Sequence, residues 1–372
     1  HYVREPGSPD VERRTMRLTR PTDNLEDLRL DPDVVRANMK EGVENLRVLR
    51  CGNSTFEIST IGTGPVVAHK STYNSAESSN KGNLREHANL AARFPGFTHL
   101  YMASFGNGGT SPLTEHEDEG KYVSRTGRFT RRRPDGTAEP IYSVRKEHEA
   151  LADAGFDVSM IFGTDSAGGS YATALALAME PGQLKKAFFS EHAGFVDLSR
   201  WAIAYGMLWR ETRNGNENRE LSPDPEAITG EKVAEATQLY DAYLSDKTRQ
   251  LLDDSGMKVT EKATKLYVRG RNMYRVMNGL RRGPHDGIFP HLEDTNYMLE
   301  HQPDAKIVFG MAERDVLYKN PALCHQAART FLQAVAVRNA TVEAMILPEM
   351  SHAYHTHMPA MYHELMRRAI LA

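Results

Sequence analysis

The segment Gly-Thr-Asp-Ser-Ala-Gly-Gly-Ser at residues 163–170 stands between an apolar strand pattern and an alanine-rich helix pattern. The strand pattern covers residues 156–162, and the helix pattern begins near Ala167 and ends before Pro181. So short a turn between a strand and a helix holds Ser166 out of the sheet with its hydroxyl exposed. The helix N-terminus behind the serine offers backbone N–H groups and a partial positive charge, and both suit a developing oxyanion.

Strands and helices alternate on both sides of this turn. Strand patterns lie at residues 65–69, 98–105, 184–190, 305–310 and 341–347, and helix patterns at 84–94, 141–154, 321–335 and 359–371. A hairpin pattern around Gly52 and Asn53 precedes them. Such alternation predicts an α/β fold with a mostly parallel central sheet and helices on both faces.

The alternation stops between about residues 196 and 300, where the pattern is helical and no strand is convincing. We predict a helical cap over 196–300, inserted into a core made of 46–195 and 301–372. The cap range is rich in aromatic and methionine side chains. Because a cap covers the strand ends, some of these side chains should line a substrate pocket, and our candidates are Trp201, Trp209, Tyr267 and Met273.

Residues 1–45 form a polar N-terminal arm that is rich in arginine and acidic residues. Such a composition cannot bury a core of its own. We therefore expect the arm to be an assembly or docking element, ordered by the body of the protein, by a second copy in a homo-oligomer, or by a different protein. The stretch 30–46 fits one amphipathic helix against the body.

Composition excludes several classes of protein. The formal net charge of −3 disfavours a nucleic-acid partner, so we interpret the run of arginines at residues 131–133 as a solvated loop. No apolar stretch approaches the length of a membrane span. The 2 cysteines cannot form a disulfide framework and no secretory signal is visible at the N-terminus, which favours a cytoplasmic location.

The strand, turn and helix around Ser166 resemble the nucleophile elbow of the α/β-hydrolases, whose usual pattern is Gly-x-Ser-x-Gly. Thr164 stands in the first glycine position, whereas Asp-Ser-Ala-Gly-Gly at 165–169 is similar to the hormone-sensitive-lipase branch. The resemblance implies the α/β-hydrolase fold. It also implies a catalytic triad in the chain order serine, acid, histidine, each residue at the end of a strand.

Two residues compete for the role of triad acid, and both follow the strand at 305–310. Counting three residues after Gly310, as in many family members, gives Glu313. The turn Ala-Glu-Arg-Asp-Val-Leu at 312–317 resembles the acid turn of the lipase branch and gives Asp315, which we prefer.

The triad histidine should follow the last strand, at 341–347. His352 is preferred over His355 and His357 because it lies closest to the end of that strand. We interpret the other two as surface histidines. No cysteine–histidine spacing or acidic cluster accompanies them, so we expect neither a metal site nor a cofactor.

The resemblance also implies an oxyanion hole made of two backbone N–H groups. One belongs to Ala167, directly after the nucleophile. The other should come from the loop after 65–69, where family members often carry His-Gly and this chain has His69-Lys70-Ser71. By position Ser71 is the preferred donor, with Lys70 as the second choice. The glycines at 106–109 are interpreted as a tight structural turn.

The expected function is hydrolysis of a small-molecule ester with an apolar acyl or alcohol part, through a Ser-His-Asp triad and an acyl-enzyme. The same triad also suits amide, thioester or carbon–carbon bond hydrolysis. A non-catalytic protein that keeps the fold for binding or assembly is the alternative from another class, because a fold alone does not assign a function.

Overall fold

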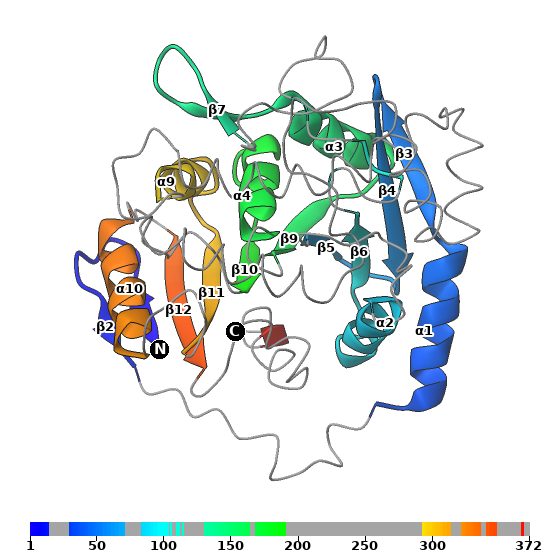
Figure 1. The fold of residues 1–372 in the computed structure, drawn as a ribbon, viewed down its shortest axis with the longest axis horizontal. Coiled ribbons are helices and arrows are strands. Elements are labelled where there is room, and N and C mark those ends of the chain that lie inside the picture. The colour runs from blue at the N-terminus through cyan, green and yellow to red at the C-terminus, as the bar shows by residue number, and fades with distance from the viewer. Residues whose placement is uncertain are drawn as a thin grey trace, which may run out of the picture.

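The computed structural model describes residues 1–14, 30–70, 83–103, 105, 109–111, 114, 130–163, 168–190, 292–313, 321–335, 340–347 and 366–367. Its main strands are β1 (Tyr2–Arg4), β2 (Glu12–Arg13), β3 (Arg47–Cys51), β4 (Ser54–Ile61), β5 (Val66–Lys70), β6 (Thr98–Met102), β9 (Val158–Gly163), β10 (Lys186–Ser190), β11 (Lys306–Ala312) and β12 (Thr341–Leu347). They form a 10-stranded sheet in the order β2-β1-β12-β11-β10-β9-β5-β6-β4-β3 (Figure 1). The predicted α/β class with a mostly parallel sheet is confirmed.

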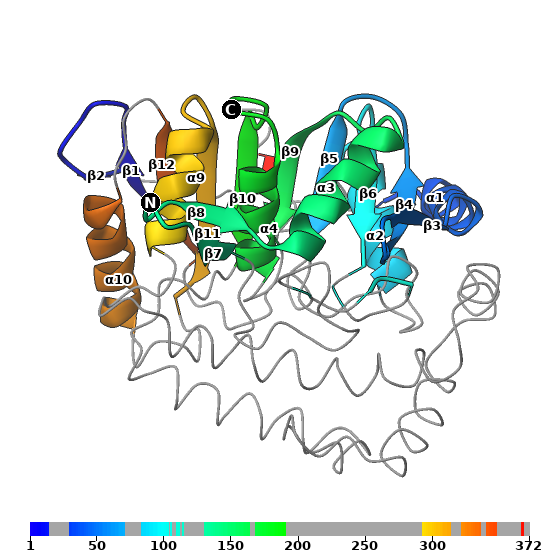
Figure 2. The same cartoon turned by 90° about the horizontal axis from the view of Figure 1, so that it is seen from above.

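Helices cover both faces of this sheet. The described helices are α1 (Pro32–Glu44), α2 (Asn83–Arg93), α3 (Tyr142–Asp153), α4 (Gly168–Ala178), α9 (Leu292–His301) and α10 (Pro321–Ala334). In the view of Figure 1, α9, α4 and α3 lie above the strands and α2 lies below them, and Figure 2 shows the same layers from above. None of the helices in the described ranges combines the length and apolar character needed to cross a lipid bilayer.

The parallel strands are buried on both faces, so successive side chains enter two separate apolar clusters. In β11, Ile307 and Phe309 join the cluster under α4, α9 and α10, while Val308 joins the cluster under α2. The second cluster also contains Met366, near the chain end. Strands buried on both faces appear in a sequence as continuous apolar runs, which is why these runs were recognisable.

The helix α9 lies within the range predicted as a cap, but it packs against the core. Its Met298 and Leu299 are buried in the cluster that contains the residues of α4. Directly after the helix, Gln302 donates from its Nε2 to the carbonyl of Ala176 over 2.9 Å and accepts at Oε1 from the backbone N–H of Leu184 over 3.0 Å. α9 thus packs against α4, whereas the rest of the predicted cap range lies outside the described residues and the boundary at 300 stays a prediction.

The arginine run at 131–133 differs from the predicted solvated loop. It overlaps β7 (Thr130–Arg132), which pairs with β8 (Ala138–Pro140) in an antiparallel hairpin. Glu139 of β8 accepts hydrogen bonds from Arg131 and Arg133 across this hairpin. These ion pairs lower the pKa of the Glu139 carboxyl although burial opposes the shift. A carboxylate opposite the arginines thus orders a stretch that the sequence suggests is irregular.

The first residues of the N-terminal arm are part of the main sheet. β1 pairs antiparallel with β12, with Tyr2 opposite Ala344. Arg4 donates from Nη1 to the carbonyls of Leu332 and Gln333, 2.8 and 3.0 Å away, at the C-terminal end of α10. These residues therefore contact the body of the protein, which is one of the three surfaces that the sequence left open.

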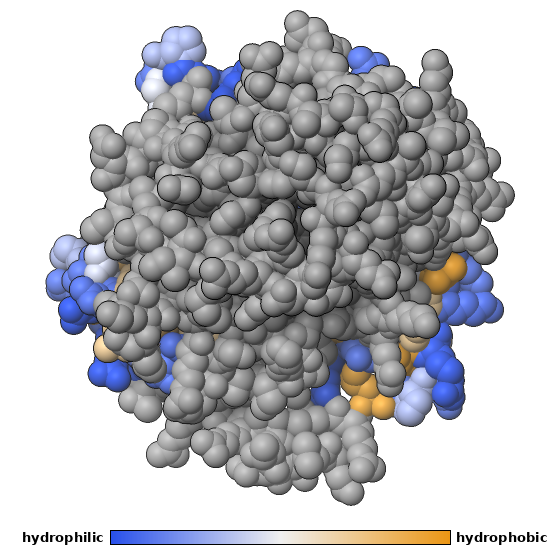
Figure 3. Space-filling model, viewed as in Figure 1, coloured by the Kyte–Doolittle hydropathy of each residue, from blue (hydrophilic) through white to orange (hydrophobic). Residues whose placement is uncertain are grey.

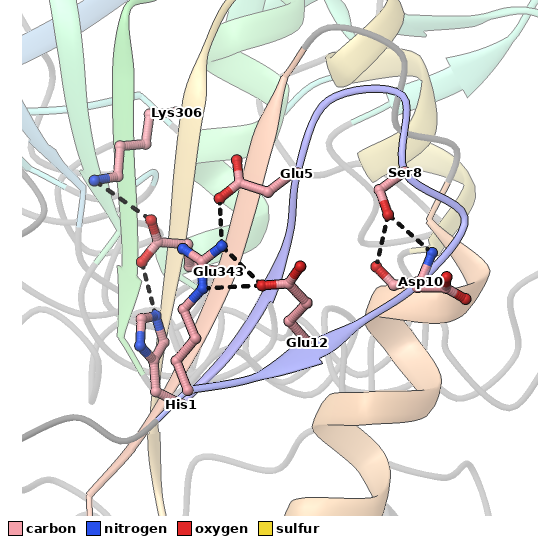
Figure 4. Close-up of polar contacts among 8 residues, drawn as sticks. His1, Glu5, Ser8, Asp10, Glu12, Lys306 and Glu343 are labelled. Atoms are coloured by element: carbon pink, nitrogen blue, oxygen red, sulfur yellow. Dashed lines mark hydrogen bonds and ion pairs between the residues drawn. The ribbon is translucent and has the colours of Figure 1, made fainter.

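Ion pairs add to the attachment of the arm (Figure 4). The imidazole of His1 lies 2.9 Å from Glu343 Oε2, and Lys306 Nζ lies 3.4 Å from Glu343 Oε1. Within the arm, Arg14 contacts both Glu5 and Glu12. Both sides of Glu343 are thus occupied by basic groups, which lower the pKa of its carboxyl although burial opposes the shift.

The second part of the arm is the predicted helix, observed as α1. Asp31 caps its N-terminus by accepting from the N–H of Asp33 over 2.8 Å. Asn38 donates to the carbonyl of Ala88 in α2 over 3.1 Å. In Figure 3, apolar surface lies beside hydrophilic surface at the lower right, where Figure 1 places α1 and α2. Val34 of α1 is the large apolar side chain that remains exposed, at 44%, among the described residues.

Deleting residues 1–14 is expected to lower the melting temperature. Tyr2 and Val3 are buried against β12 and α10, and burying side chains of this size contributes about 1.5–3 kcal/mol each. Differential scanning calorimetry of the truncated and full chains measures the effect, with Glu12→Ala on exposed β2 as the control. An unchanged melting temperature in the truncated protein would mean that the β1 contacts contribute nothing to stability.

Candidate active site

The carboxyl ends of the parallel strands meet at one edge of the sheet, where α/β proteins bind their ligands. Gly163, the last residue of β9, lies in register with Lys70 on β5 and with Phe189 on β10. At the next pair of strands, Ala312 of β11 lies in register with Leu347 of β12. The strands that precede the three predicted catalytic segments therefore end together on this edge.

Most of the predicted site residues lie outside the described residues. They are Ser166, Ala167, Asp315, His352, His355, His357 and Ser71, together with the pocket candidates Trp201, Trp209, Tyr267 and Met273. Their roles stay predictions. Lys70 and Glu313 are the two predicted site residues that the structure describes.

The structure describes both sides of the turn that carries Ser166. β9 ends at Gly163 and α4 begins at Gly168, so four residues connect strand and helix. Within α4, Thr173 donates from its hydroxyl to the carbonyl of Gly169 over 2.9 Å. The helix is apolar on all sides and deeply buried, as expected for a helix packed between the sheet and other helices. The predicted strand and helix are thus confirmed, separated by a very short connection.

At the proposed acid turn, Glu313 contacts helix α10. Its backbone N–H donates to the carbonyl of Leu347 over 3.0 Å, which joins the end of β11 to the end of β12. Its carboxylate Oε1 lies 3.1 Å from Nε2 of His325 in α10, and Nδ1 of that ring lies 3.3 Å from the hydroxyl of Tyr2. Assigning the proton to Nε2 lets Tyr2 donate to the ring and the ring donate to Glu313.

Lys70 is buried, with 1% of its side chain exposed, and its partner Glu147 of α3 is equally buried. Lys70 Nζ donates to Glu147 Oε1 over 2.6 Å. The ammonium also lies 5.2 Å from the ring centre of Phe105 and 5.8 Å from that of Tyr171 in α4. Burial raises the pKa of the Glu147 carboxyl, and the ammonium of Lys70 opposes that shift.

On the opposite face of β5, His69 belongs to a buried histidine cluster with His99 and His87. His69 Nε2 lies 3.1 Å from His99 Nδ1, and His99 Nε2 lies 3.0 Å from the carbonyl of Phe94. Since that carbonyl can only accept, His99 carries its proton on Nε2, and His69 must donate to Nδ1. The rings of His69 and His87 stack on Tyr101, with centres 4.5 and 3.7 Å away.

Burial lowers the pKa of each histidine in this cluster. The pKa of His69 is shifted well down and that of His99 is also lowered, while the pKa of His87 falls to about 3. The side chains are held neutral by apolar surroundings. In the described part of the chain, no group of three or more histidine, cysteine or acidic side chains has an arrangement that could hold a metal ion.

The loop after β6, predicted as a tight glycine turn, is held by a buried carboxylate that the sequence did not reveal. Glu57 of β4 accepts from the backbone N–H of Gly109 over 2.6 Å, and its own N–H donates to the hydroxyl of Thr110 over 2.9 Å. A Cβ at position 109 would lie 2.7 Å from Val48 Cγ2, which is too close for a larger residue. The glycine is therefore required by close packing.

Comparisons with known proteins give matches of backbone structure only. No family model and no curated protein matches the chain. The carboxylesterase CesB of Bacillus subtilis is 11% identical, with 90% of this chain and 96% of that chain covered and a TM-score of 0.44. The esterase RhEst1 of Rhodococcus sp. ECU1013 is 14% identical, with 87% and 98% covered and a TM-score of 0.46. MGS-M2, an α/β-hydrolase enzyme from a Medee basin deep-sea metagenome library, is 16% identical, with 87% and 97% covered and a TM-score of 0.47.

The order and direction of the strands decide the fold. We count the strands along the chain from β3 to β12 and leave out the separate β7–β8 hairpin. In the sheet, the strands counted in this way lie in the order 1-2-4-3-5-6-7-8. β4 is antiparallel to both of its neighbours, and the strands from β6 to β12 pair in parallel. The chain has the α/β-hydrolase fold. To the α/β-hydrolase sheet this chain adds β1 and β2, which extend the sheet beyond β12.

Proposed function

We propose that this protein is a serine hydrolase that cleaves a carboxylic ester with an apolar acyl or alcohol part, using Ser166, His352 and Asp315. The observation that carries the proposal is the common edge at which β9, β11 and β12 end. Each of these strands leads directly into the segment that contains one member of the triad. The short connection between β9 and α4 supports an exposed serine at the start of a helix.

In the proposed mechanism, His352 takes the proton from the Ser166 hydroxyl as the oxygen attacks the ester carbonyl. The carbonyl electrons move to the oxygen, which the backbone N–H of Ala167 and that of Ser71 or Lys70 stabilise. The intermediate collapses, the bond to the alcohol breaks, and His352 gives its proton to the leaving alcohol. Water, deprotonated by the same histidine, then attacks the acyl carbonyl. The bond between the acyl carbon and the Ser166 oxygen breaks, His352 returns the proton to that oxygen, and the acid is released.

Asp315 is the proposed partner of His352. A triad acid accepts a hydrogen bond from Nδ1 of the histidine and fixes its orientation and tautomer. The contact between Glu313 and His325 supports this choice, because it draws the Glu313 carboxylate toward α10.

Ser166→Ala should abolish esterase activity and labelling by a fluorophosphonate probe, because the only activated hydroxyl is removed. Intact-mass spectrometry measures labelling, and hydrolysis of p-nitrophenyl acetate measures activity. Ser159→Ala, on β9, is the matched control and should keep both. Stoichiometric labelling at another serine, or full activity in the Ser166 variant, would refute the proposed function.

The proposed pocket should favour longer acyl chains. If Trp201, Trp209, Tyr267 and Met273 line it, each buried methylene contributes about 0.8 kcal/mol. Lengthening the acyl group of a p-nitrophenyl ester from about two to six carbons should then raise kcat/KM by more than about tenfold. Trp201→Ala should flatten this series. A kcat/KM that stays level or falls from acetate onward in the unaltered protein would indicate a small or polar pocket.

A further inference from the structure

We propose that Lys70 and Glu147 act as a positioning pair, which joins the end of β5 to α3 and, through the ring of Tyr171, to α4, the helix that follows Ser166. The pair would thereby hold the oxyanion loop and the nucleophile in register. The inference rests on the proposed function, because it gives the pair a role in the same site. It concerns the side chain of Lys70, whereas the oxyanion hole concerns backbone N–H groups.

The first argument is the position of Lys70 relative to both sides of the serine turn. In the sheet, Lys70 lies in register with Gly163, the last residue before that turn. Its ammonium lies over the ring of Tyr171, in the first turns of α4 on the other side. One residue therefore contacts both β9 and α4, the two elements that flank Ser166 in the sequence.

The second argument is the number of elements that meet at the ammonium. Glu147 comes from α3, Phe105 from the loop after β6, Tyr171 from α4 and Lys70 itself from β5. A lysine side chain has four rotatable bonds and is usually mobile. Here a hydrogen bond and two ring contacts fix it, and this also fixes the backbone from which Ser71 follows.

The third argument concerns what the pair contributes to the stability of the fold. A buried ion pair is costly to desolvate, and well-packed apolar residues of similar volume often stabilise a fold equally well or better. Glu147 Oε2 is moreover buried without a hydrogen-bond partner among the described residues. Such an arrangement is a poor device for stability alone. A directional contact that sets the position of β5 relative to α3, and holds the ammonium beside Tyr171 of α4, accounts for it better.

The double variant Lys70→Met/Glu147→Leu separates stability from positioning, because it removes both charges and fills the space with apolar side chains. We expect it to fold, with a melting temperature near that of the unaltered protein. We also expect its fluorophosphonate labelling rate and its kcat on p-nitrophenyl acetate to fall about tenfold or more, with a smaller change in KM. Faster amide hydrogen exchange over residues 164–171 should accompany these losses.

The pair Lys146 and Glu149 on the same helix, which is far more exposed than Lys70 and Glu147, provides the control. Lys146→Met/Glu149→Leu should leave labelling, kcat and hydrogen exchange unchanged. Glu147→Gln, which keeps the shape of the side chain, serves if the first double variant does not fold, and it should also slow labelling. A folded Lys70/Glu147 or Glu147 variant with unaltered labelling, kcat and exchange would overturn the inference. If the unaltered protein neither reacts with the probe nor cleaves esters, the proposed function fails, while hydrogen exchange still tests the coupling.

Discussion

Replacing Asp315 by asparagine is expected to lower kcat about 10⁴-fold while the protein remains folded. An amide in place of the carboxylate favours the wrong tautomer of His352, so the ring can no longer take the serine proton. Ground-state binding does not depend on that proton, and KM should change far less than kcat. Steady-state hydrolysis of p-nitrophenyl acetate gives both constants, and circular dichroism checks that the variant is folded.

Glu313→Gln is the matched comparison, two residues away on the same turn. We expect a mild loss, because the Glu313 carboxylate contacts His325 and the neutral amide oxygen can still accept that hydrogen bond. A large loss in Glu313→Gln together with a small one in Asp315→Asn would transfer the role of the triad acid to Glu313.

Stability is expected to decrease as the pH falls below about 6.5, because the buried histidine cluster resists protonation. The pKa values of His69 and His99 are lowered by burial in the folded protein, so these side chains bind protons more readily once the chain unfolds. The stabilising effect is present above the unfolded pKa and is lost progressively below it. Each histidine can contribute up to about 1.4 kcal/mol per pH unit in that window. The pKa of His87 is lowered by burial to about 3, so this side chain adds to the effect in the same direction.

Urea unfolding at about pH 7 and pH 5 measures this effect, as the difference in the free energy of unfolding. The paired carboxylates of Glu139 and Glu343, whose pKa values are lowered, stay ionised over that interval and contribute little. The Glu147 carboxyl, whose pKa is raised, changes the free energy of unfolding in the opposite direction, because the folded protein binds this proton more readily than the unfolded chain. His69→Gln should lower the number of protons that the chain takes up on unfolding by about one, and the slope of the unfolding free energy with pH should decrease accordingly. Equal free energies of unfolding at the two pH values would show that the cluster does not control acid stability.

The strands that form the proposed site were predictable because they are buried on both faces. The apolar run at 341–347 has the same bounds as β12, and the run at 305–310 differs from β11 only at its ends. Each run stands between polar turns, which fixes its limits in the sequence. The strand–helix junction around Ser166 was equally recognisable, from an apolar run and an alanine-rich helix on either side.

Contacts between distant residues could not be predicted. Lys70 and Glu147 are 77 residues apart, and each looks like an ordinary surface residue by type. The position of Glu147 held one signal, because it shares a helix face with Val144 and Leu151, both buried. β1 is too short to show a strand period, and its place is set by the edge of β12. α9 shows the same helical sequence pattern as the range before it, so its packing against α4 could not be read from that pattern.

The hairpin of β1 and β2 also determines what the molecule presents to its neighbours in solution. With the hairpin in place, the outermost of the described strands on that side is β2, which has two residues, Glu12 and Arg13, both exposed and oppositely charged. A short, charged edge is a poor template for another strand, whereas β12 alone would offer the apolar edge of TVEAMIL. The arm therefore protects the chain from edge-to-edge aggregation. On this basis its removal should promote self-association, the opposite of what an oligomerisation arm would do.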